Sequence, residues 1–498
     1  MPKLTRRRLV AAAGGFTIVP RHVLGGAGFM PPSEKINIAF IGVGSQGLRV
    51  MLDFLEQPDV QAVAVCDVNR RSNDYPQWGK YEFRERVTKL LGGSAPAWVE
   101  WLSTNRPIRL TPLSVTYGGL AGWEPCRRIV NAYYGKVKRS GDWKGCNAYT
   151  DFRELLEKED CDAVVVGTPD HWHAHISIAA MRKGKHVFCQ KPMTHSVAEA
   201  RKMAEVARQT GVVTQVAVGN QASEDSRLVR EWIAAGVIGK VRRVENWSTR
   251  PVWPQALVRP AEKPPVPEGL DWDLWVGPSP ARPYHPIYLP FVWRGWYDFG
   301  TGAIGDMGCY SFDTIFRALK LEAPESVEAS STYLYEETYP AAGVIHFRFP
   351  ARGSMPPVLL SWYDGRLKPP RPPEMEPDRK LASEGLLFLG DEGTLLCRFH
   401  GMRPRLVPEE KMKRFTPPPK TLPRSPSNER EWLDAIRDRS KTTGANFEFE
   451  AKVTETILLG NVAQRAGGLI RWDSRAMKAV NVDAGELIRP GYRKGWEL

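Results

Sequence analysis

Three glycines that follow an apolar run form the clearest chemical signal in the chain. Gly42, Gly44 and Gly47 fit the spacing Gly-x-Gly-x-x-Gly between a predicted strand and a segment with apolar residues at helical spacing. In that context the glycines allow a tight turn, close approach of a pyrophosphate and close packing of helix on strand. The pattern predicts a dinucleotide site at the positive end of a helix. The expected contacts are Gly42, Gly44, Ser45, Gln46 and Gly47.

An acidic residue lies where such sites usually bind the adenosine ribose. Asp67 follows a second predicted strand at 62–66, about 20 residues beyond Gly47. A carboxylate there accepts hydrogen bonds from ribose hydroxyls, which favours NAD as the cofactor. Arg70 and Arg71 lie close in sequence and leave NADP open, because arginine suits a 2′-phosphate.

A lysine lies directly after another predicted strand, at 185–190. Ligands of parallel α/β sheets bind beyond the carboxyl ends of the strands, and Gln190-Lys191-Pro192 occupies such an end. The Lys191 ammonium could polarise a substrate hydroxyl or carbonyl and hold it in line for hydride transfer. A lone lysine is usually solvated, but its place at a strand end favours a functional role.

Two carboxylates and a tyrosine recur at helical spacing further along the chain. Asp306, Tyr310 and Asp313 stand at i, i+4 and i+7 and share one face of a regular helix, predicted over 305–319. Oxidising an alcohol needs a base for the hydroxyl proton, and a nearby ammonium would lower the pKa of a tyrosine in that role. An amphipathic helix with a polar outer face explains the same spacing.

An aromatic stretch precedes this predicted helix. Trp293 and Arg294 lie within Trp-Arg-Gly-Trp-Tyr-Asp, and aromatic faces stack on sugar rings while arginine pairs with hydroxyls or a carboxylate. The prediction is a substrate-binding wall. Core tryptophans are the alternative.

Together these stretches resemble the glucose–fructose oxidoreductase / inositol dehydrogenase / MocA (Gfo/Idh/MocA) family of oxidoreductases. The resemblance runs from about residue 34 to at least residue 320. It is carried by motifs in the expected order, namely Gly42-x-Gly44-x-x-Gly47, Asp67, Thr168-Pro169-Asp170-His171-Trp172-His173, Gln190-Lys191-Pro192 and Asp306-x-Gly308-x-Tyr310-x-x-Asp313.

The resemblance implies an NAD(P)-dependent oxidoreductase that acts on a sugar or sugar derivative, with a cofactor that is tightly bound and recycled. Alternatives are a redox-neutral glycoside hydrolase or epimerase that works through a transient keto-sugar, and a non-catalytic dinucleotide-binding sensor. Lys191, Tyr310 and Asp306 become the expected catalytic group, with Tyr310 as proton shuttle and Asp306 positioning the substrate.

The remaining site residues also follow from the resemblance. The substrate would contact Lys191, Trp293, Arg294, Asp306, Tyr310 and Asp313. The cofactor would contact Thr168, Pro169, His173 and Lys191 in addition to the glycine loop and Asp67. Two departures stand out, since Gln190 replaces the usual glutamate and Tyr310 the commoner histidine.

Strands that alternate with helices predict a doubly wound parallel sheet of Rossmann type, followed by an α+β domain with a largely antiparallel open sheet. The expected boundaries are 1–33 for a leader, 34–222 for the Rossmann domain, 223–445 for the substrate and oligomerisation domain, and 446–498 for a helical return and tail. Residues 75–150 form an insertion, in which the pattern predicts helices and no strand, and which could cover one edge of the cofactor site.

The bulk composition is that of a globular protein with ordinary surface charge. The net charge is +13 and the hydrophobic share 42 %, with no nucleic-acid motif and no segment that could span a bilayer. Seven cysteines without paired spacing predict neither a disulfide framework nor a metal site. His171, His173 and His175 alternate, and alternate residues diverge on a helix, so no metal is expected. A homo-oligomer formed through the second sheet is expected.

The N-terminus resembles a twin-arginine export signal. Arg6, Arg7 and Arg8 precede a weakly apolar stretch at 9–20 that is too short for a membrane span. The signal predicts a periplasmic or otherwise exported protein. A disordered basic tail is the alternative.

Overall fold

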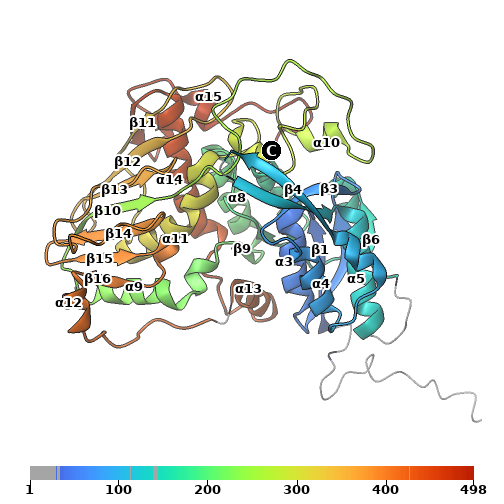
Figure 1. Cartoon of the computed structure of the whole chain (residues 1–498), viewed down its shortest axis with the longest axis horizontal. Helices are drawn as coiled ribbons and strands as arrows, with labels where there is room; N and C mark the ends of the chain where they lie inside the picture. Colours follow the sequence, from blue (N-terminus) through green and yellow to red (C-terminus); the bar gives the residue numbers. More distant parts are fainter. Residues whose placement is uncertain (1–29, 31–33, 113, 138–143, 426) are drawn as a thin grey trace, which may run out of the picture.

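The computed structural model describes residues 30, 34–112, 114–137, 144–425 and 427–498. Two sheets lie side by side in this part of the chain, with helices packed on and between them (Figure 1). Nearly all of the leader predicted at 1–33 lies outside the described residues. None of the helices within the described ranges is long and apolar enough to cross a membrane.

The first sheet is parallel throughout, in the order β6-β2-β1-β7-β8-β9. Its strands are β1 (Ile36–Ile41), β2 (Val60–Cys66), β6 (Asn147–Tyr149), β7 (Ala163–Val166), β8 (His186–Cys189) and β9 (Thr214–Val216). Helices cover both faces, so the strands are apolar runs without alternation. The predicted Rossmann architecture is confirmed.

The helices of this unit divide between the two faces of the sheet. One face packs against α3 (Ser45–Leu55), α5 (Trp123–Val137) and α13 (Asn428–Arg437). The other packs against α6 (Phe152–Lys158), α7 (His173–Arg182) and α8 (Val197–Thr210). A capping box begins α8, since Ser196 and Glu199 each bond the other's backbone amide.

The insertion contains a small antiparallel sheet, so the expectation of helices without strands is wrong. Its order is β3-β5-β4, with β3 (Ser72–Gln77), β4 (Ser103–Thr111) and β5 (Ser114–Ala121), beside α4 (Glu82–Leu90) and the 3₁₀ turn η2 (Ala97–Leu102). The sequence conceals it because β3 is polar and contains Pro76, and β5 carries Gly118 and Gly119. Gly119 is needed because a Cβ there would lie 2.6 Å from the Phe83 ring.

The second sheet is mixed and largely antiparallel, in the order β16-β15-β14-β10-β13-β12-β11-β17-β18. Its strands are β10 (Val241–Trp247), β11 (Ser326–Ser331), β12 (Gly343–Phe349), β13 (Val358–Tyr363), β14 (Gly385–Gly390), β15 (Thr394–Cys397), β16 (Arg405–Val407), β17 (Leu469–Asp473) and β18 (Lys478–Ala479). Strands β10 and β13 run parallel, and every other pair of neighbouring strands in this order is antiparallel. Strands β14 and β15 form a hairpin, with Leu389 opposite Thr394.

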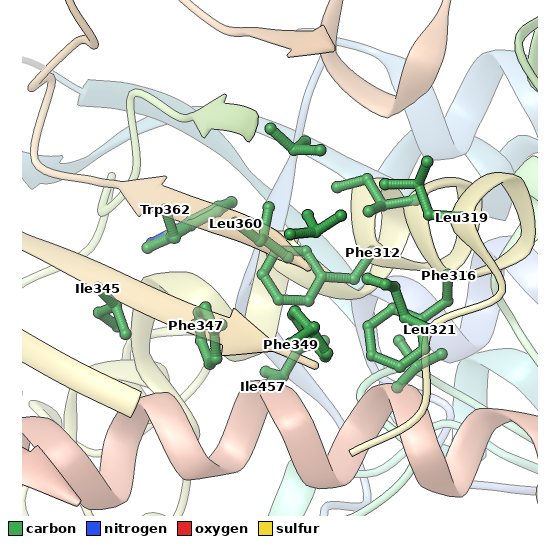
Figure 2. Packing of buried hydrophobic residues seen from close by; sticks show 14 of the residues in the cluster. Phe312, Phe316, Leu319, Leu321, Ile345, Phe347, Phe349, Leu360, Trp362 and Ile457 are labelled. Atoms are coloured by element: carbon green, nitrogen blue, oxygen red, sulfur yellow. The ribbon is translucent and has the colours of Figure 1, made fainter. Parts of the chain in front are cut away.

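Both faces of this sheet are covered, at least in part. One packs on α9 (Glu224–Ala234), α11 (Cys309–Leu319) and α14 (Phe447–Arg465), and Figure 2 shows aromatic side chains of α11 meeting those of β12. On the other face Met375 and Leu381, from the proline-rich connection after β13, pack against Trp247. Short helices α12 (Glu409–Lys413) and α15 (Gly485–Ile488) lie near the ends of the sheet.

The C-terminal part of the chain ties the two units together. Helix α14 packs on α8 of the first unit and on β11 of the second, and it is buried nearly all round. In α13 the Trp432 ring lies 5.7 Å from Phe54 and 5.5 Å from Phe188, inside the core of the first sheet. The relative position of the two sheets is therefore set by packed helices.

Candidate active site

A cleft lies beyond the carboxyl ends of β1, β7 and β8, between the parallel sheet and the segment that connects β10 to α11. Most of the predicted site residues line it, namely Gly42, Gly44, Ser45, Gln46, Asp67, Thr168, Pro169, Lys191, Trp293, Arg294, Asp306 and Tyr310. Tyr75, Pro76 and Trp78 of the insertion also line it, so the insertion does border the cleft. Gly47, His173 and Asp313 do not line it. The chemical roles of all these residues stay predictions.

The glycine loop leaves no room for side chains. A Cβ at Gly47 would lie 1.8 Å from the Gly42 carbonyl oxygen, so this position holds α3 against β1 as the spacing predicts. Gly42 has a φ of +80° and a Cβ there would lie 2.6 Å from the Thr168 amide nitrogen. The loop thus keeps its backbone amides at the start of α3 accessible from the cleft.

Three buried polar atoms at the cleft have no hydrogen-bond partner in the described part of the chain. They are Ser45 Oγ, Thr168 Oγ1 and Gln190 Nε2, and all three residues line the cleft. Buried polar groups are normally hydrogen-bonded, so these atoms point to a polar ligand. Phosphate, ribose and carboxamide groups of a dinucleotide would supply the missing partners, and the site fits NAD on this ground.

Asp67 is buried at the end of β2 and holds the glycine loop in place. Its carboxylate accepts hydrogen bonds from the backbone amides of Val43 at 2.8 Å and Asn69 at 2.9 Å. Burial raises the pKa of Asp67 to about 6, so the group is largely ionised at neutral pH. Arg70 and Arg71 do not line the cleft, since both are mostly exposed and face Glu124.

Lys191, Arg294 and Asp306 form a buried ion cluster that joins the two units. Lys191 Nζ lies 2.7 Å from Asp306 Oδ1 and 2.5 Å from the Asp306 carbonyl oxygen, and Arg294 Nε lies 3.0 Å from the same Oδ1. Burial disfavours the charged form of Asp306, but Lys191 and Arg294 outweigh it and hold its pKa below the ordinary value. Burial also opposes the charge of Lys191, but Asp306 raises its pKa. Lys191 is therefore a fixed cation and a hydrogen-bond donor.

Tyr310 packs beside Lys191, with the Lys191 Nζ 5.0 Å from the centre of its ring. The Tyr310 ring also stacks on that of His400, with the ring centres 4.4 Å apart. The Lys191 ammonium lowers the pKa of Tyr310, as expected, but burial has the larger effect and the pKa lies above its ordinary value. Burial lowers the pKa of His400 to about 4, so its imidazole is neutral at pH 7.

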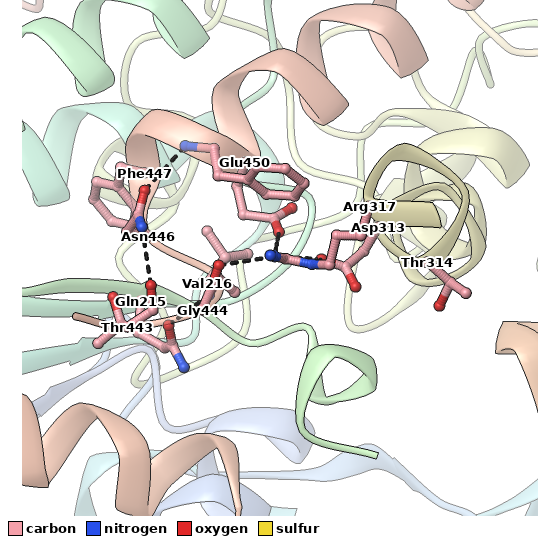
Figure 3. Close-up of polar contacts among 12 residues, drawn as sticks. Gln215, Val216, Asp313, Thr314, Arg317, Thr443, Gly444, Asn446, Phe447 and Glu450 are labelled. Carbon is pink, nitrogen blue, oxygen red and sulfur yellow. Dashed lines mark hydrogen bonds and ion pairs between the residues drawn. The ribbon is translucent and has the colours of Figure 1, made fainter. Parts of the chain in front are cut away.

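Asp313 does not reach the cleft, contrary to the prediction that it contacts a sugar hydroxyl. It is fully buried and binds Arg317 at 2.7 Å, and Arg317 also reaches Glu450 of α14 at 3.4 Å (Figure 3). The turn at Ile304–Gly308 is a π-helix, which holds more residues per turn than an α-helix. The wider turn changes the angle around the helix axis between Asp306 and Asp313. The two carboxylates therefore do not share one face, as the spacing of a regular α-helix predicts.

The three alternating histidines bond backbone carbonyls. His173 lies 2.7 Å from the carbonyl oxygen of Pro192 and 3.0 Å from that of Thr168. It therefore links the loop that carries Thr168 to the loop that carries Lys191, without lining the cleft itself. The prediction that it lies near ribose and substrate does not fit this position. His171 lies near the carbonyl oxygens of Trp275 and Phe299, and His175 near that of Trp496. The residues that the structure describes contain no metal-binding group of three His, Cys, Asp or Glu side chains.

Several residues that line the cleft were not singled out from the sequence. Asp170 follows Thr168-Pro169, bonds Thr301 at 2.6 Å, and has its pKa raised by burial to about 7. Arg250, Phe291 and His400 come from the second unit. Phe291 and His400 both have a φ of +69°, a strained value for such residues that marks them in the structure but leaves no signal in the sequence.

Two family models match the chain. One is described as "Oxidoreductase family, NAD-binding Rossmann fold" and matches residues 126–218. The other is described as "Oxidoreductase family, C-terminal alpha/beta domain" and matches residues 229–346. The first match falls on the parallel sheet and the second on the start of the mixed sheet, in the order in which the chain forms them.

Curated relatives match shorter parts of the chain. It is 30 % identical over 187 residues to the 1,5-anhydro-D-fructose reductase of Ensifer adhaerens, covering 36 % of this chain and 44 % of that protein. It is 30 % identical over 110 residues to the levoglucosan dehydrogenase of Pseudarthrobacter phenanthrenivorans, covering 21 % of this chain and 28 % of that protein. The chain thus spans less than half the length of either relative.

Solved structures share the fold over most of the chain. The WlbA dehydrogenase from Bordetella pertussis, solved in complex with NADH and UDP-GlcNAcA, has a TM-score of 0.51 at 15 % identity, covering 88 % of this chain and 99 % of that one. At this identity the likeness shows the architecture alone.

The buried pair of Asp313 and Glu450 predicts a structural role for Asp313. Burial and the Asp313 carboxylate raise the pKa of Glu450, and Arg317 contacts both carboxyl groups. We expect Asp313→Ala to lower the free energy of unfolding by about 1–3 kcal/mol, because Glu450 remains for Arg317. Arg317→Met leaves two buried carboxyls without a cation and should cost about 3–5 kcal/mol. Urea unfolding measures both.

The exposed Asp378 provides the control, and Asp378→Ala should change stability by no more than about 0.5 kcal/mol. Calorimetric titration should give the same NAD affinity for Asp313→Ala and the parent protein. An Asp313→Ala variant of unchanged stability and weakened sugar binding would restore the original prediction.

Proposed function

We propose that the chain is a member of the Gfo/Idh/MocA family of oxidoreductases and an NAD-dependent enzyme that transfers a hydride to or from a carbon atom of a sugar or sugar derivative. The observation that carries the proposal is the shared cleft. Lys191, Asp306 and Tyr310 line the same cavity as the glycine loop and the unpartnered hydroxyls of Ser45 and Thr168.

A bound nicotinamide supplies or accepts the hydride, and the glycine loop, Asp67 and Thr168 would hold the cofactor. Lys191 would donate a hydrogen bond to the substrate oxygen and stabilise negative charge on it during transfer. Two bonds to Asp306 and an interaction with Tyr310 hold the ammonium, which has three donors, so a substrate oxygen would bind beside the Tyr310 hydroxyl and take the third donor. Pre-positioning of this kind lowers the entropic cost of reaching the reactive geometry.

Tyr310 would move the proton that accompanies hydride transfer. Because burial raises its pKa, Tyr310 keeps its proton at neutral pH and is suited to protonate the oxygen of a ketone that is being reduced. In the oxidising direction it would need a substrate hydroxyl and Lys191 together to lower the cost of the phenolate. Asp306 would act by holding Lys191 and Arg294.

Two relatives that are 30 % identical are named as a 1,5-anhydro-D-fructose reductase and a levoglucosan dehydrogenase, which favours net oxidation or reduction of a sugar. Relatives that are 23 % identical over 211 residues are named as family 109 glycosyl hydrolases of Shewanella, so a redox-neutral hydrolase is the second candidate. The Lys191–Asp306 pair weighs against a non-catalytic sensor. Trp293 would provide the wall on which the sugar ring stacks, beside Arg294. We further propose that the protein forms a homo-oligomer through the second sheet.

Replacing Lys191 tests the proposed chemistry. We expect Lys191→Met to fold, because Arg294 still pairs with Asp306, and to bind NAD as the parent does. Sugar-dependent formation of reduced nicotinamide should fall by at least about 100-fold, since the donor to the substrate oxygen is lost. Absorbance of the reduced cofactor measures turnover, and Lys183→Met on the surface is the control. Turnover within a few-fold of the parent would remove Lys191 from the mechanism.

Asp67 predicts that NAD binding depends on pH. Its pKa of about 6 should fall when ribose hydroxyls donate to the carboxylate, so binding should release protons near pH 6 and weaken as the pH drops from 7 to 5. Burial raises the pKa values of nearby Tyr75 and Cys126, which stay neutral throughout this range. Calorimetry in buffers of different ionisation enthalpy measures the protons released.

The variant Asp67→Asn should bind NAD more weakly at pH 7 and lose most of this pH dependence. The parent should also bind NAD more tightly than NADP, because Asp67 would repel a 2′-phosphate while Arg70 and Arg71 lie outside the cleft. Tighter NADP binding would overturn the choice of NAD.

We also propose export through the twin-arginine route, on the sequence of residues 6–20. An exported enzyme would meet little free NAD, which fits a cofactor that is bound before export and recycled in place. In a bacterial host the full chain should fractionate with the periplasm. Replacing Arg6, Arg7 and Arg8 by lysine keeps the charge and should leave the folded protein in the cytoplasm. Equal periplasmic yields of the two proteins would contradict the proposal.

A further inference from the structure

The reacting end of the cleft combines a surplus of cationic groups with hydrogen-bond donors that lack partners. Lys191 and Arg294 share a single carboxylate oxygen of Asp306, so one anion faces two cations. A second carboxyl that lines the cleft, Asp170, has a pKa raised by burial to about 7 and is only about half ionised at neutral pH. The ligand that completes this end of the cleft must therefore supply acceptors, and negative charge would be favourable there.

Arg294 is held rigidly with part of its guanidinium unused. The Arg294 Cζ atom lies 4.2 Å from the ring centre of Trp293 and 4.4 Å from that of Phe291. The two aromatic rings therefore hold the plane of the guanidinium group in place. Nε bonds Asp306, and Nη1 bonds the Phe291 carbonyl oxygen at 3.1 Å. Nη2 has no partner among the residues described. A fixed guanidinium with a remaining donor binds an oxyanion at low entropic cost.

Arg250 is a second cation of the cleft that is held only loosely. Its side-chain contacts within the described ranges are Nη1 to Thr249 Oγ1 at 3.5 Å and Nη1 to Glu384 Oε1 at 3.4 Å. That carboxylate oxygen already accepts shorter bonds, among them one from Ser248 at 2.7 Å. Because both contacts use Nη1, the Nε and Nη2 donors of Arg250 are available to a ligand in the cleft that this side chain lines. Its long contacts leave Arg250 free to turn toward a stronger anion.

Gln190 contributes a neutral donor where the family usually has a glutamate. It is 6 % exposed, lines the cleft, and its Nε2 has no partner among the described residues. A glutamate would place a third carboxyl next to Lys191 and offset the surplus of positive charge. The Gln190 amide instead adds a hydrogen-bond donor. Like Arg250 and Arg294, it makes the cleft more favourable for a ligand that carries acceptors or negative charge.

We propose that the substrate is an acidic sugar, whose carboxylate binds between Arg250 and Arg294 while the carbon that exchanges hydride lies at Lys191. The inference rests on the proposed function and narrows its substrate class. A guanidinium group binds a carboxylate through two parallel hydrogen bonds. The local surplus is about half a charge, because Lys191, Arg250 and Arg294 face Asp306, Glu384 and a half-ionised Asp170. This matches a monoanionic carboxylate better than a phosphate, which carries about two charges.

Binding to NAD-loaded protein tests the proposal separately from turnover. Trp293 and Trp253 lie 4.2 and 5.9 Å from the Arg294 guanidinium, so tryptophan fluorescence should report occupation of the site. The probes are matched pairs of glucuronate and glucose, galacturonate and galactose, and mannuronate and mannose, with glucose 6-phosphate as a further anion. We expect at least one uronate to bind at least about tenfold more tightly than its neutral partner, and less tightly as salt is added.

Variants of Arg250 identify the group responsible. Arg250→Gln should reduce the preference for the uronate at least about fivefold, and Arg250→Lys should restore part of it, since the charge returns without the planar fork. The exposed Arg348→Gln on β12 is the control and should keep the parent preference. Each variant is judged by the ratio of its affinities for the uronate and the matched neutral sugar, so a general effect of the variant on folding cancels. Partial restoration of this ratio by Arg250→Lys excludes a purely structural effect.

Three results would overturn the inference. They are equal binding of acid and neutral sugar in every pair, a preference unchanged by Arg250→Gln, and tighter binding of glucose 6-phosphate than of any uronate. Reduction of NAD by neutral sugars alone would also overturn it but would leave the proposed function intact. Failure of the protein to bind NAD would instead remove the proposed function itself.

Discussion

The carboxylate of Asp306 is the point on which the rest of the site depends. It comes from the second unit, and it binds Lys191 from the end of β8 in the first unit and Arg294 from the connecting segment. An ion cluster with so little solvent contact is costly to form and more costly to break, because each unpaired member would remain as a buried charge. The cluster therefore favours one relative placement of the two units, the placement in which Lys191 lies beside the cofactor loop.

Packing supports the same placement from the opposite side of the molecule. Helix α14 lies between α8 and the second sheet, and α13 inserts Trp432 among aromatic rings of the first sheet. The Asp313, Arg317 and Glu450 group joins α11 to α14, so the helix that carries Tyr310 is itself anchored. At the mouth of the cleft the Trp78 ring of the insertion meets Phe291 at 5.5 Å. Cleft geometry is thus determined by contacts on three sides.

What the sequence predicts well is local. The glycine loop, Asp67 and the strand that precedes Lys191 lie within single strand–turn–helix units, so residue spacing alone locates them. The strands of the insertion were missed because Pro76 and paired glycines conceal strands that are held by packing on Phe83. Asp313 was misplaced because a π-helical turn shifts the helical phase. Arg250 and His400 were missed because tertiary folding alone brings them to the cleft.

The protonation state of Tyr310 bears on the direction of the reaction. The Lys191 ammonium favours a phenolate and opposes the effect of burial on Tyr310. Burial then dominates and keeps the phenol protonated. A protonated phenol beside a fixed ammonium is an arrangement of two donors around one substrate oxygen. Under the proposed function, such an arrangement would stabilise an alkoxide as it forms from a ketone, and it therefore suits the reduction of a ketone better than the deprotonation of an alcohol.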